Sequence, residues 1–427
     1  MNIAVIGSGI AGLSCAHALA RAGTGRVTLY EAGSYLGGHT NTVDISLDGI
    51  THPVDTGFLV FNHRTYPRLV HLFADLGVPT AKSEMSFSVS LDGGRLEWAG
   101  HSLATVFAQP KNLLRPAFLR MLADLLRFNR AASAAAAAPL QAGGAGISLG
   151  EYLARGRYSD AFRDWYLLPM AGAIWSCPTR TMLDYPFATF ARFCLNHGLL
   201  QVADRPQWHT VRGGAREYVR RMARSLADIR LACPVQRVRR VAGGVVVHSS
   251  AGNARYDHVV LACHSDQALR MLDAPSARES AVLGAIKYQP NLAYVHTDLA
   301  LMPRRRRVWA AWNYLSADTD TLDGRPVAVS YLMNRLQPLP FKTPLMVTLN
   351  PAHAPAQEST LARIEYAHPV FDGPAIDAQQ VLPALQGFGG LWFAGAWTGY
   401  GFHEDGLASG LAVAAALQER AALKAAA

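Results

Sequence analysis

Residues 1–31 read MNIAVIGSGIAGLSCAHALARAGTGRVTLYE. The short apolar run at residues 2–6 predicts a buried β-strand, and the small and apolar residues from about 9 to 22 predict a helix that follows a tight turn. The β-branched and aromatic segment RVTLY predicts a second strand. A strand, a turn, a helix and a second strand in this order are typical of the first unit of a doubly wound α/β domain.

The turn and the start of the helix carry the spacing G-x-G-x-x-G. In such a unit the first glycine permits the turn, the second lets the backbone approach a pyrophosphate, and the third lets the helix pack closely on the strand. The exposed N–H groups at the start of the helix add a partial positive charge. The residues predicted to hold a dinucleotide here are Gly7, Gly9, Ile10, Ala11 and Gly12.

Glu31 ends the second strand and lies about 20 residues after Gly12, where a carboxylate accepts hydrogen bonds from the ribose hydroxyls of an adenosine. Ala32 and Gly33 follow it, so a 2′-phosphate has no arginine partner. NADP is therefore disfavoured, whereas NAD and FAD both fit this segment.

The composition sets wider limits. The chain has 427 residues, of which 50% are hydrophobic and 17% charged, so it can form two or three domain-sized cores and is not globally disordered. Its five cysteines are scattered without a CxxC pair, which argues against a disulfide scaffold and a zinc site. No Lys or Arg precedes the N-terminal apolar run, and no run is long enough to span a membrane. We expect a soluble, cytoplasmic protein without a metal ion.

Two motifs follow Glu31, GGHT at residues 37–40 and VDTGF at residues 54–58, and they distinguish FAD from NAD. With them the sequence resembles the flavin-dependent amine oxidase and phytoene desaturase superfamily, in which a Gly-Gly-Arg-Thr turn and an Asp-x-Gly strand pass beside the flavin. The resemblance implies FAD and places near it Gly38, Thr40, Asp55, Thr56, Gly57 and Phe58.

His39 departs from that pattern, because the superfamily usually has arginine at this position. A neutral imidazole cannot replace a bidentate guanidinium in neutralising a pyrophosphate. His39 is therefore predicted either to contact the cofactor or to be an ordinary surface histidine of the turn.

The C-terminal segment GLWFAGAWTGYGFHEDGLASGLAVAAAL predicts a buried strand at residues 391–394, a glycine-rich turn and a helix that begins near Asp405. A helix N-terminus suits the flavin pyrimidine oxygens, where reduction builds negative charge. The resemblance places Gly395, Phe402, His403 and Leu407 beside the flavin and gives Val235 a backbone contact to adenine. No cysteine follows Cys263, so a cysteinyl link from the C-terminal half is excluded and noncovalent FAD is expected.

The chain is predicted to leave the FAD-binding domain and return to it. We assign residues 1–80, 205–285 and 385–427 to a discontinuous, Rossmann-like FAD domain, and residues 81–204 and 286–384 to an α+β substrate domain of the amine-oxidase type.

Several motifs resemble a narrower group, the flavoproteins found beside cyclopropane-fatty-acid-synthase-like lipid methyltransferases and as the N-terminal oxidase region of plant cyclopropane synthases. They include DTGF, MSFSVS, KYQPNLAYVHTD and GFHEDG. This resemblance implies an FAD-dependent oxidoreductase that acts on a lipid acyl chain, methylated or unsaturated, with a lipid methyltransferase as a partner. An amine oxidase and a flavin-containing partner without redox activity stay open as alternatives.

Hydride transfer to flavin N5 requires the protein to orient the substrate carbon and to remove a proton. His403 and Glu404 are the acid/base candidates, and Asp55 is a polar group expected near the ring. Amine oxidases of the superfamily hold a water near N5 with a lysine. Its expected position falls near Asn291, and the nearest lysine, Lys287, lies upstream, which weakens the amine alternative.

The net charge of +9 has two recognisable sources, an arginine-bearing amphipathic pattern at residues 112–132 and the run Arg304 to Arg307. Both fall in the predicted substrate domain, and neither accompanies a nucleic-acid-binding motif. The pattern fits a packed helix with solvated arginines or peripheral contact with an anionic membrane. We expect no nucleic-acid partner.

Overall fold

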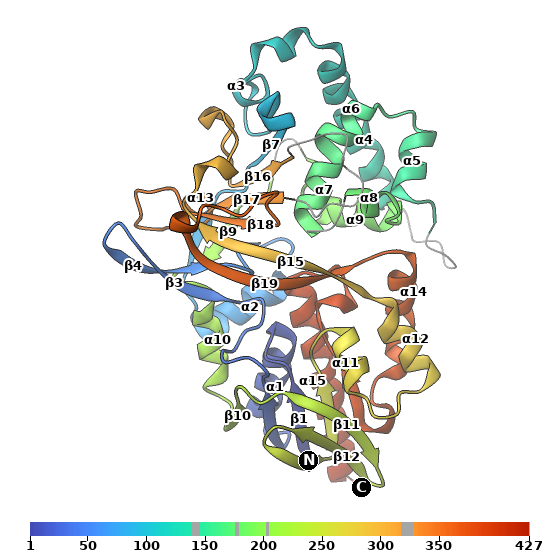
Figure 1. The fold of residues 1–427 in the computed structure, drawn as a ribbon. Helices are drawn as coiled ribbons and strands as arrows, with labels where there is room; N and C mark the ends of the chain where they lie inside the picture. The colour runs from blue at the N-terminus through green and yellow to red at the C-terminus, as the bar shows by residue number, and fades with distance from the viewer. Residues whose placement is uncertain (138–145, 176–178, 202–204, 317–327, 427) are drawn as a thin grey trace.

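The computed structural model describes residues 1–137, 146–175, 179–201, 205–316 and 328–426. Its lower half in Figure 1 is built on a parallel five-stranded sheet in the order β10-β2-β1-β14-β20. The strands are β10 (Asp228–Arg230), β2 (Arg26–Tyr30), β1 (Asn2–Ile6), β14 (His258–Leu261) and β20 (Leu391–Phe393). They come from three distant parts of the chain, so the sheet forms only when the chain returns twice. The predicted discontinuous, doubly wound α/β domain is confirmed.

The N-terminal unit matches its pattern closely. β1 covers the predicted residues, and α1 (Ile10–Arg21) begins one residue later than expected. β1 is central in the sheet and packs on both faces, which explains why its residues are continuously apolar. α1 packs against the C-terminal helix α15 (His403–Ala426), which begins two residues before the expected Asp405.

The upper half is built on a mixed seven-stranded sheet in the order β19-β15-β18-β17-β16-β7-β8. The strands are β19 (Thr360–Val370), β15 (Lys287–His296), β18 (Met346–Leu349), β17 (Ala328–Leu332), β16 (Trp312–Leu315), β7 (Phe87–Leu91) and β8 (Leu96–Ala99). All lie within the segments assigned to the substrate domain, whereas the strands of the parallel sheet lie within those assigned to the FAD domain. The exact domain limits stay a prediction.

Smaller sheets complete the fold. They are the hairpin β3 (Thr42–Leu47) and β4 (Ile50–Asp55), the sheet of β5 (Phe61–Asn62), β9 (Trp208–Val211) and β6 (Thr80–Ser83), and the antiparallel sheet of β11 (Val235–Val241), β12 (Gly244–Ser249) and β13 (Gly252–Tyr256). The remaining helices near the parallel sheet and its junctions are α2 (Pro67–Leu76), α10 (Arg216–Ala223), α11 (Ser265–Met271), α12 (Ala277–Ala285) and α14 (Gly373–Val381). The short α13 (Met333–Leu336) packs on β17 and β18 of the seven-stranded sheet.

Helices cover one end of the seven-stranded sheet (Figure 1). They are α3 (Leu103–Val106), α4 (Pro116–Ala137), α5 (Leu149–Arg155), α6 (Asp160–Phe162), α7 (Leu168–Trp175), α8 (Thr179–Leu183) and α9 (Phe187–Asn196). Within the described ranges, no helix is both long and apolar enough to cross a membrane.

The basic amphipathic pattern corresponds mainly to α4, which starts at Pro116 after a short 3₁₀ turn rather than at residue 112. Arg120 and Arg127 both form ion pairs with the buried Asp124. Arg115 stacks over Trp165, with its guanidinium carbon 4.3 Å from the ring centroid. The packed-helix interpretation therefore accounts for these three arginines.

Candidate active site

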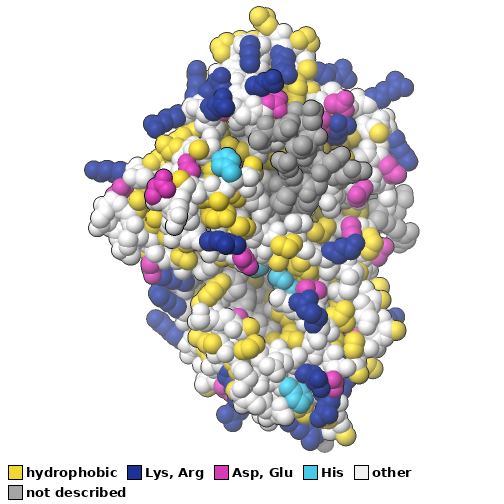
Figure 2. Space-filling model, viewed as in Figure 1, with side chains coloured by type: hydrophobic (Ala, Val, Ile, Leu, Met, Phe, Trp, Pro, Cys, Tyr) yellow, Lys and Arg dark blue, Asp and Glu magenta, His cyan; other side chains and the backbone are white. Residues whose placement is uncertain are grey.

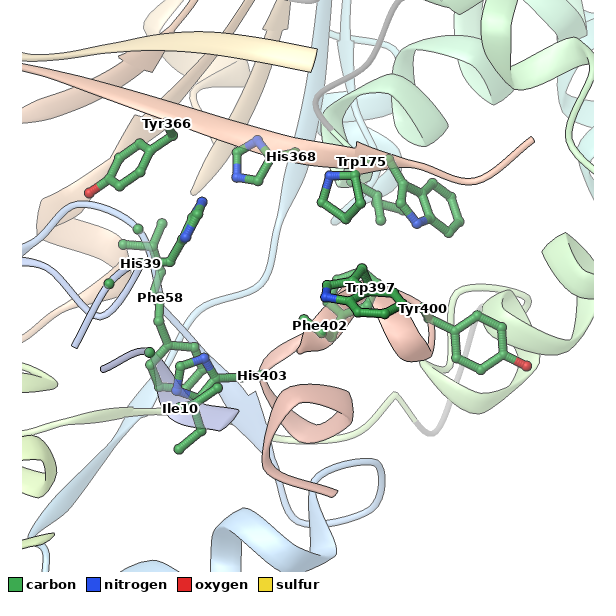
Figure 3. A pocket seen from close by; sticks show the side chains of 18 of the residues that line it. Ile10, His39, Phe58, Trp175, Tyr366, His368, Trp397, Tyr400, Phe402 and His403 are labelled. Atoms are coloured by element: carbon green, nitrogen blue, oxygen red, sulfur yellow. The ribbon is translucent and has the colours of Figure 1, made fainter. Parts of the chain in front are cut away.

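A cavity of about 1110 Å³ lies between the two large sheets. Its walls come from the turn after β1, the end of β14, the end of β19, α7, and the segment between β20 and α15 (Figure 3). The cavity thus joins the end of the parallel sheet that carries the glycine motif to the substrate half of the molecule.

The glycine turn forms one end of this cavity. Gly7 has a φ of +103°, which favours glycine, and a side chain at Gly9 would meet no atom within 4 Å. A Cβ at Gly12 would lie 1.9 Å from the carbonyl oxygen of Gly7, so this glycine allows α1 to pack on the strand end. Gly7 and Gly9 line the cavity, and Gly12 lies behind them against the end of the strand.

Glu31 lines the same end of the cavity. Its carboxylate accepts hydrogen bonds from the backbone N–H of Ser8 at 2.9 Å and of Gly33 at 2.8 Å. The hydroxyl of Ser8 donates to the same carboxylate at 2.5 Å. These contacts fix the carboxylate in place and leave an acceptor site for a ribose hydroxyl. Val235, for which the resemblance implies a contact to adenine, also lines the cavity.

His39 faces the cavity and is not a surface histidine of the turn. Its ring stacks on Tyr366 at 5.0 Å and lies 5.2 Å from the ring of His368, and its Nε2 is buried without a hydrogen-bond partner. Burial holds the pKa of His39 well below its usual value, and the nearby histidines lower it further. A neutral ring with an unpaired nitrogen can bond a hydroxyl of the cofactor, so the residue present fits FAD without acting as a cation.

A hydrogen-bond chain orients His368. The backbone N–H of Leu292 donates to Asn350, the amide of Asn350 donates to Asn291 at 2.6 Å, and the amide of Asn291 donates to Nδ1 of His368 at 2.8 Å. Because Nδ1 accepts, the neutral ring carries its proton on Nε2. Burial lowers the pKa of His368 to about 4. His368 therefore presents a fixed N–H donor at the cavity wall (Figure 3).

Asn291 occupies the position at which the resemblance leads us to expect a lysine. Nζ of Lys287 lies 3.9 Å from Oδ2 of Asp372, and the side chain of Lys287 is 74% exposed. Among the described residues that line the cavity there is no lysine.

His403 is held tightly on the opposite wall. Its ring stacks on Phe58 with centroids 3.8 Å apart, and its Nε2 lies 2.6 Å from the hydroxyl of Tyr218. The same hydroxyl lies 2.5 Å from that of Thr40. Burial lowers the pKa of His403 to about 3, so the ring is neutral near pH 7. The geometry favours a positioning role for His403 over that of a proton donor.

Glu404 does not face the cavity. Its carboxylate accepts hydrogen bonds from the backbone N–H groups of Arg68 at 2.9 Å and Leu69 at 3.0 Å. These are orphan donors at the start of α2, so Glu404 ties the first turn of that helix to α15. This position argues against the predicted acid/base role of Glu404.

Asp55 is also occupied elsewhere. Its carboxylate accepts hydrogen bonds from Thr42, from the backbone of Ala215 and from Gln337, at 2.5, 2.8 and 2.7 Å. Burial raises the pKa of Asp55 to about 6 despite these donors. Asp55 connects three distant segments and does not line the cavity, which argues against direct contact with the flavin ring.

The predicted residues divide into two sets. Those that line the cavity are Gly7, Gly9, Ile10, Ala11, Glu31, Gly38, His39, Thr56, Gly57, Phe58, Val235, Gly395, Phe402 and His403. Those that lie outside its lining are Gly12, Thr40, Asp55, Glu404 and Leu407. The first set surrounds one continuous space that fits a dinucleotide extended from the glycine turn to the start of α15.

Beyond this set the cavity continues as an arm under the seven-stranded sheet. Its walls are mainly apolar and aromatic, and they include Met85, Phe87, Trp98, Tyr166, Met170, Ile174 and Trp312. Trp175 and Phe193 border the arm from the aromatic cluster at residues 160–195, most of which is ordinary core. Phe193 stacks on Phe402 at 4.8 Å, which places an aromatic box where the arm meets the start of α15.

Sequence reasoning missed several lining residues, among them His264, Tyr366, His368, Trp397 and Tyr400. His264 follows β14 and His368 lies near the end of β19, and no local sequence pattern distinguishes either residue. Tyr400 is two residues before Phe402, so the glycine-rich turn was a signal that could have suggested it.

Comparison with known proteins adds an independent finding. A model of the family described as flavin-containing amine oxidoreductase matches residues 10–368. Among curated proteins, none matches this chain.

Three solved structures share the fold. Cyclohexylamine oxidase from Brevibacterium oxydans is 17% identical with a TM-score of 0.69, and the match covers 98% of this chain and 99% of that one. A putative protoporphyrinogen oxidase from Exiguobacterium sp. is 18% identical with a TM-score of 0.68, covering 98% and 99%. A CLA-producing fatty acid isomerase from P. acnes is 15% identical with a TM-score of 0.68, covering 98% of each chain.

Proposed function

The chain belongs to the flavin-containing amine oxidoreductase family, and we propose that this FAD-dependent oxidoreductase oxidises or desaturates a lipid acyl chain. The apolar arm of the cavity is the observation that carries the proposal. Its walls offer a long hydrocarbon surface that an acyl chain can cover, and burying each methylene contributes about 0.8 kcal/mol. The acyl group can belong to a fatty acid or a phospholipid, methylated or unsaturated.

The charges along the cavity support an acyl substrate over an amine. In the described lining the carboxylates are Glu31, at the nucleotide end, and Glu84. Glu84 forms an ion pair with Arg335 at 2.7 Å. An ammonium group would therefore find aromatic faces in the arm but no unpaired carboxylate.

Arg205 gives the arm a cation. It lines the cavity, and its Nε donates to the carbonyl of Gln201 at 2.9 Å. Its positive charge lowers the pKa of Tyr166, whose ring lines the same arm, against the larger raising effect of burial. The other lining arginine, Arg270, is paired with Asp266. We propose that Arg205 binds the carboxylate or phosphate of the substrate while the acyl chain occupies the arm.

The mechanism divides between cofactor and protein. FAD, when held by the glycine turn, Glu31 and the start of α15, would supply the hydride acceptor for the oxidation of a substrate carbon. The apolar walls hold the chain and exclude water, and the N–H of His368 can donate a hydrogen bond to an oxygen at the cavity wall. The N-terminus of α15, which begins at His403, directs a partial positive charge toward the cavity.

Anaerobic mixing tests the substrate class. We expect fatty acids or phospholipids with an unsaturated or methyl-branched chain to bleach the flavin absorbance band, whereas saturated alkylamines and polyamines leave it unchanged. Bleaching by amines alone would replace the proposal with an amine oxidase, which the aromatic box around Phe402 favours. Tight FAD binding without bleaching by any substrate would instead indicate a flavin-containing partner of a lipid methyltransferase.

A second prediction concerns Arg205. We expect Arg205→Gln to raise KM for a fatty acid about tenfold, because one charge-assisted hydrogen bond contributes roughly 1.5 kcal/mol or more. Arg205→Lys should restore part of the affinity, and FAD binding should not change in either variant. An equal KM for a fatty acid and its uncharged methyl ester in the original protein would show that Arg205 does not bind the head group.

A further inference from the structure

An exposed leucine cluster lies at the end of the helical part of the molecule. Leu103, Leu113, Leu114 and Leu119 have exposed fractions of 79%, 52%, 87% and 44%. They belong to α3, the 3₁₀ turn before α4, and the first turn of α4. We call these four residues the leucine tip. Hydrophobic side chains gather at the upper end of Figure 2, with Lys and Arg side chains directly below them.

The leucines are exposed although their supporting structure is ordered. Phe107 packs on the buried Phe118 with ring centroids 5.9 Å apart. Ser102 caps α3 by accepting a hydrogen bond from the backbone of Thr105. Side chains of this size on a well-packed scaffold are typical of a surface that contacts an apolar partner.

The charge around the tip identifies the kind of partner. Between residues 98 and 150 the sequence has one carboxylate, Asp124, and five cations, Lys111, Arg115, Arg120, Arg127 and Arg130. Asp124 is buried and paired with two of these arginines, so it does not offset the others. An apolar tip within a field of cations complements a surface that is both apolar and anionic.

A second group of cations flanks the same end. Glu97 of β8 binds the backbone N–H of Arg304 at 2.7 Å and the side chain of Arg305 at 2.7 Å. This fixes the loop of Arg304 to Arg307 beside β8, which leads directly into α3, and all four arginines are exposed. The pairing leaves Arg304, Arg306 and Arg307 available to anions.

We propose that the leucine tip inserts into an anionic lipid bilayer and that the exposed Lys111, Arg304, Arg306 and Arg307 bind its head groups. The contact is peripheral, because the tip is made of two short helical turns and the start of a third helix. Trp98 and Gly100, which line the apolar arm, lie within a few residues of Leu103. The proposal does not rest on the proposed substrate, since it follows from surface residues alone.

Vesicle sedimentation tests the proposal with the FAD-loaded protein. We expect binding to vesicles that contain phosphatidylglycerol in phosphatidylcholine, with weaker binding to pure phosphatidylcholine and at high salt. The double variant Leu113→Ser/Leu114→Ser should bind these vesicles at least about tenfold more weakly, because two leucines no longer enter the bilayer. Lys111→Glu should weaken binding to the anionic vesicles only.

Leu423→Ser is the matched control, because Leu423 is 71% exposed but lies in α15 near the other end of the molecule. It should bind vesicles as the original protein does. Equal loss in this control, or no binding of the original protein at low salt, would overturn the proposal. A dimer that the double variant converts to a monomer would show that a second copy covers the tip instead. Flavin absorbance and Tm confirm that each variant folds.

Discussion

Replacing Gly9 with alanine should weaken FAD binding about 100-fold while leaving the stability of the FAD-free protein unchanged. An added Cβ at this position meets no atom within 4 Å and the φ of −61° suits any residue, so the fold tolerates it. The methyl group would, however, stand in the cavity where the backbone has to approach the pyrophosphate. The loss corresponds to roughly 3 kcal/mol of charge-assisted hydrogen bonds. Titration of the FAD-free protein, followed by flavin fluorescence, measures the affinity.

Gly12→Ala is the matched comparison and should give the opposite result. Its Cβ would lie 1.9 Å from the carbonyl oxygen of Gly7, so α1 and the strand end must separate. We expect the FAD-free protein to lose about 3 kcal/mol in its free energy of unfolding, measured with urea. If Gly9→Ala lowers stability as much as Gly12→Ala, or leaves FAD affinity intact, the assignment of the two glycines is wrong.

Acid should destabilise the FAD-free protein strongly. Burial lowers the pKa of His197, His296 and His368 to about 4 and that of His403 to about 3. Below pH 6.5 these histidines bind protons in the unfolded chain, whereas in the folded protein they stay neutral. The free energy of unfolding therefore falls as the pH falls from 6.5 toward 4. The loss of unfolding free energy is roughly 1 to 2 kcal/mol for each ring at pH 5.

Two carboxyl groups oppose this trend. Burial raises the pKa of Asp55 and Asp405 to about 6. Lowering the pH from 7 to 5 therefore increases the free energy of unfolding by about 1 kcal/mol for each carboxyl group. The histidines outnumber them, and we expect Tm at pH 5 to lie about 5 °C or more below Tm at pH 7. His296→Gln should reduce the pH dependence in both the FAD-free and the FAD-loaded protein, because His296 bonds Thr348 and does not line the cavity. A Tm that does not change between pH 7 and 5 would contradict the neutral rings.

The sequence predicted those parts of the site whose geometry is local. The glycine spacing and Glu31 form within one strand–turn–helix–strand unit, so their separation along the chain fixes their separation in space. Residues 54–58 and the turn between β20 and α15 are also continuous segments, so the spacing of their residues in the sequence predicts their spacing in the structure. These segments supply most of the predicted residues that line the cavity.

The remaining contacts depend on segments that meet only in the folded protein. The orientation of His368 depends on Asn291 and Asn350, which lie on or next to neighbouring strands of the seven-stranded sheet. Glu404 follows His403 directly but points to α2, because one residue along a helix turns the side chain by about 100°. The acid/base role predicted for Glu404 failed for this reason.

The order of strands in the parallel sheet has a consequence for biosynthesis. β1 is the first strand made, yet its neighbour β14 ends at Leu261 and the edge strand β20 ends at Phe393. A ribosome must therefore make β20 and α15 before the glycine turn has a finished sheet beneath it and α15 beside it. The complete flavin site therefore needs residues from both early and late parts of the sequence, and we expect FAD to bind only after β20 and α15 have been made.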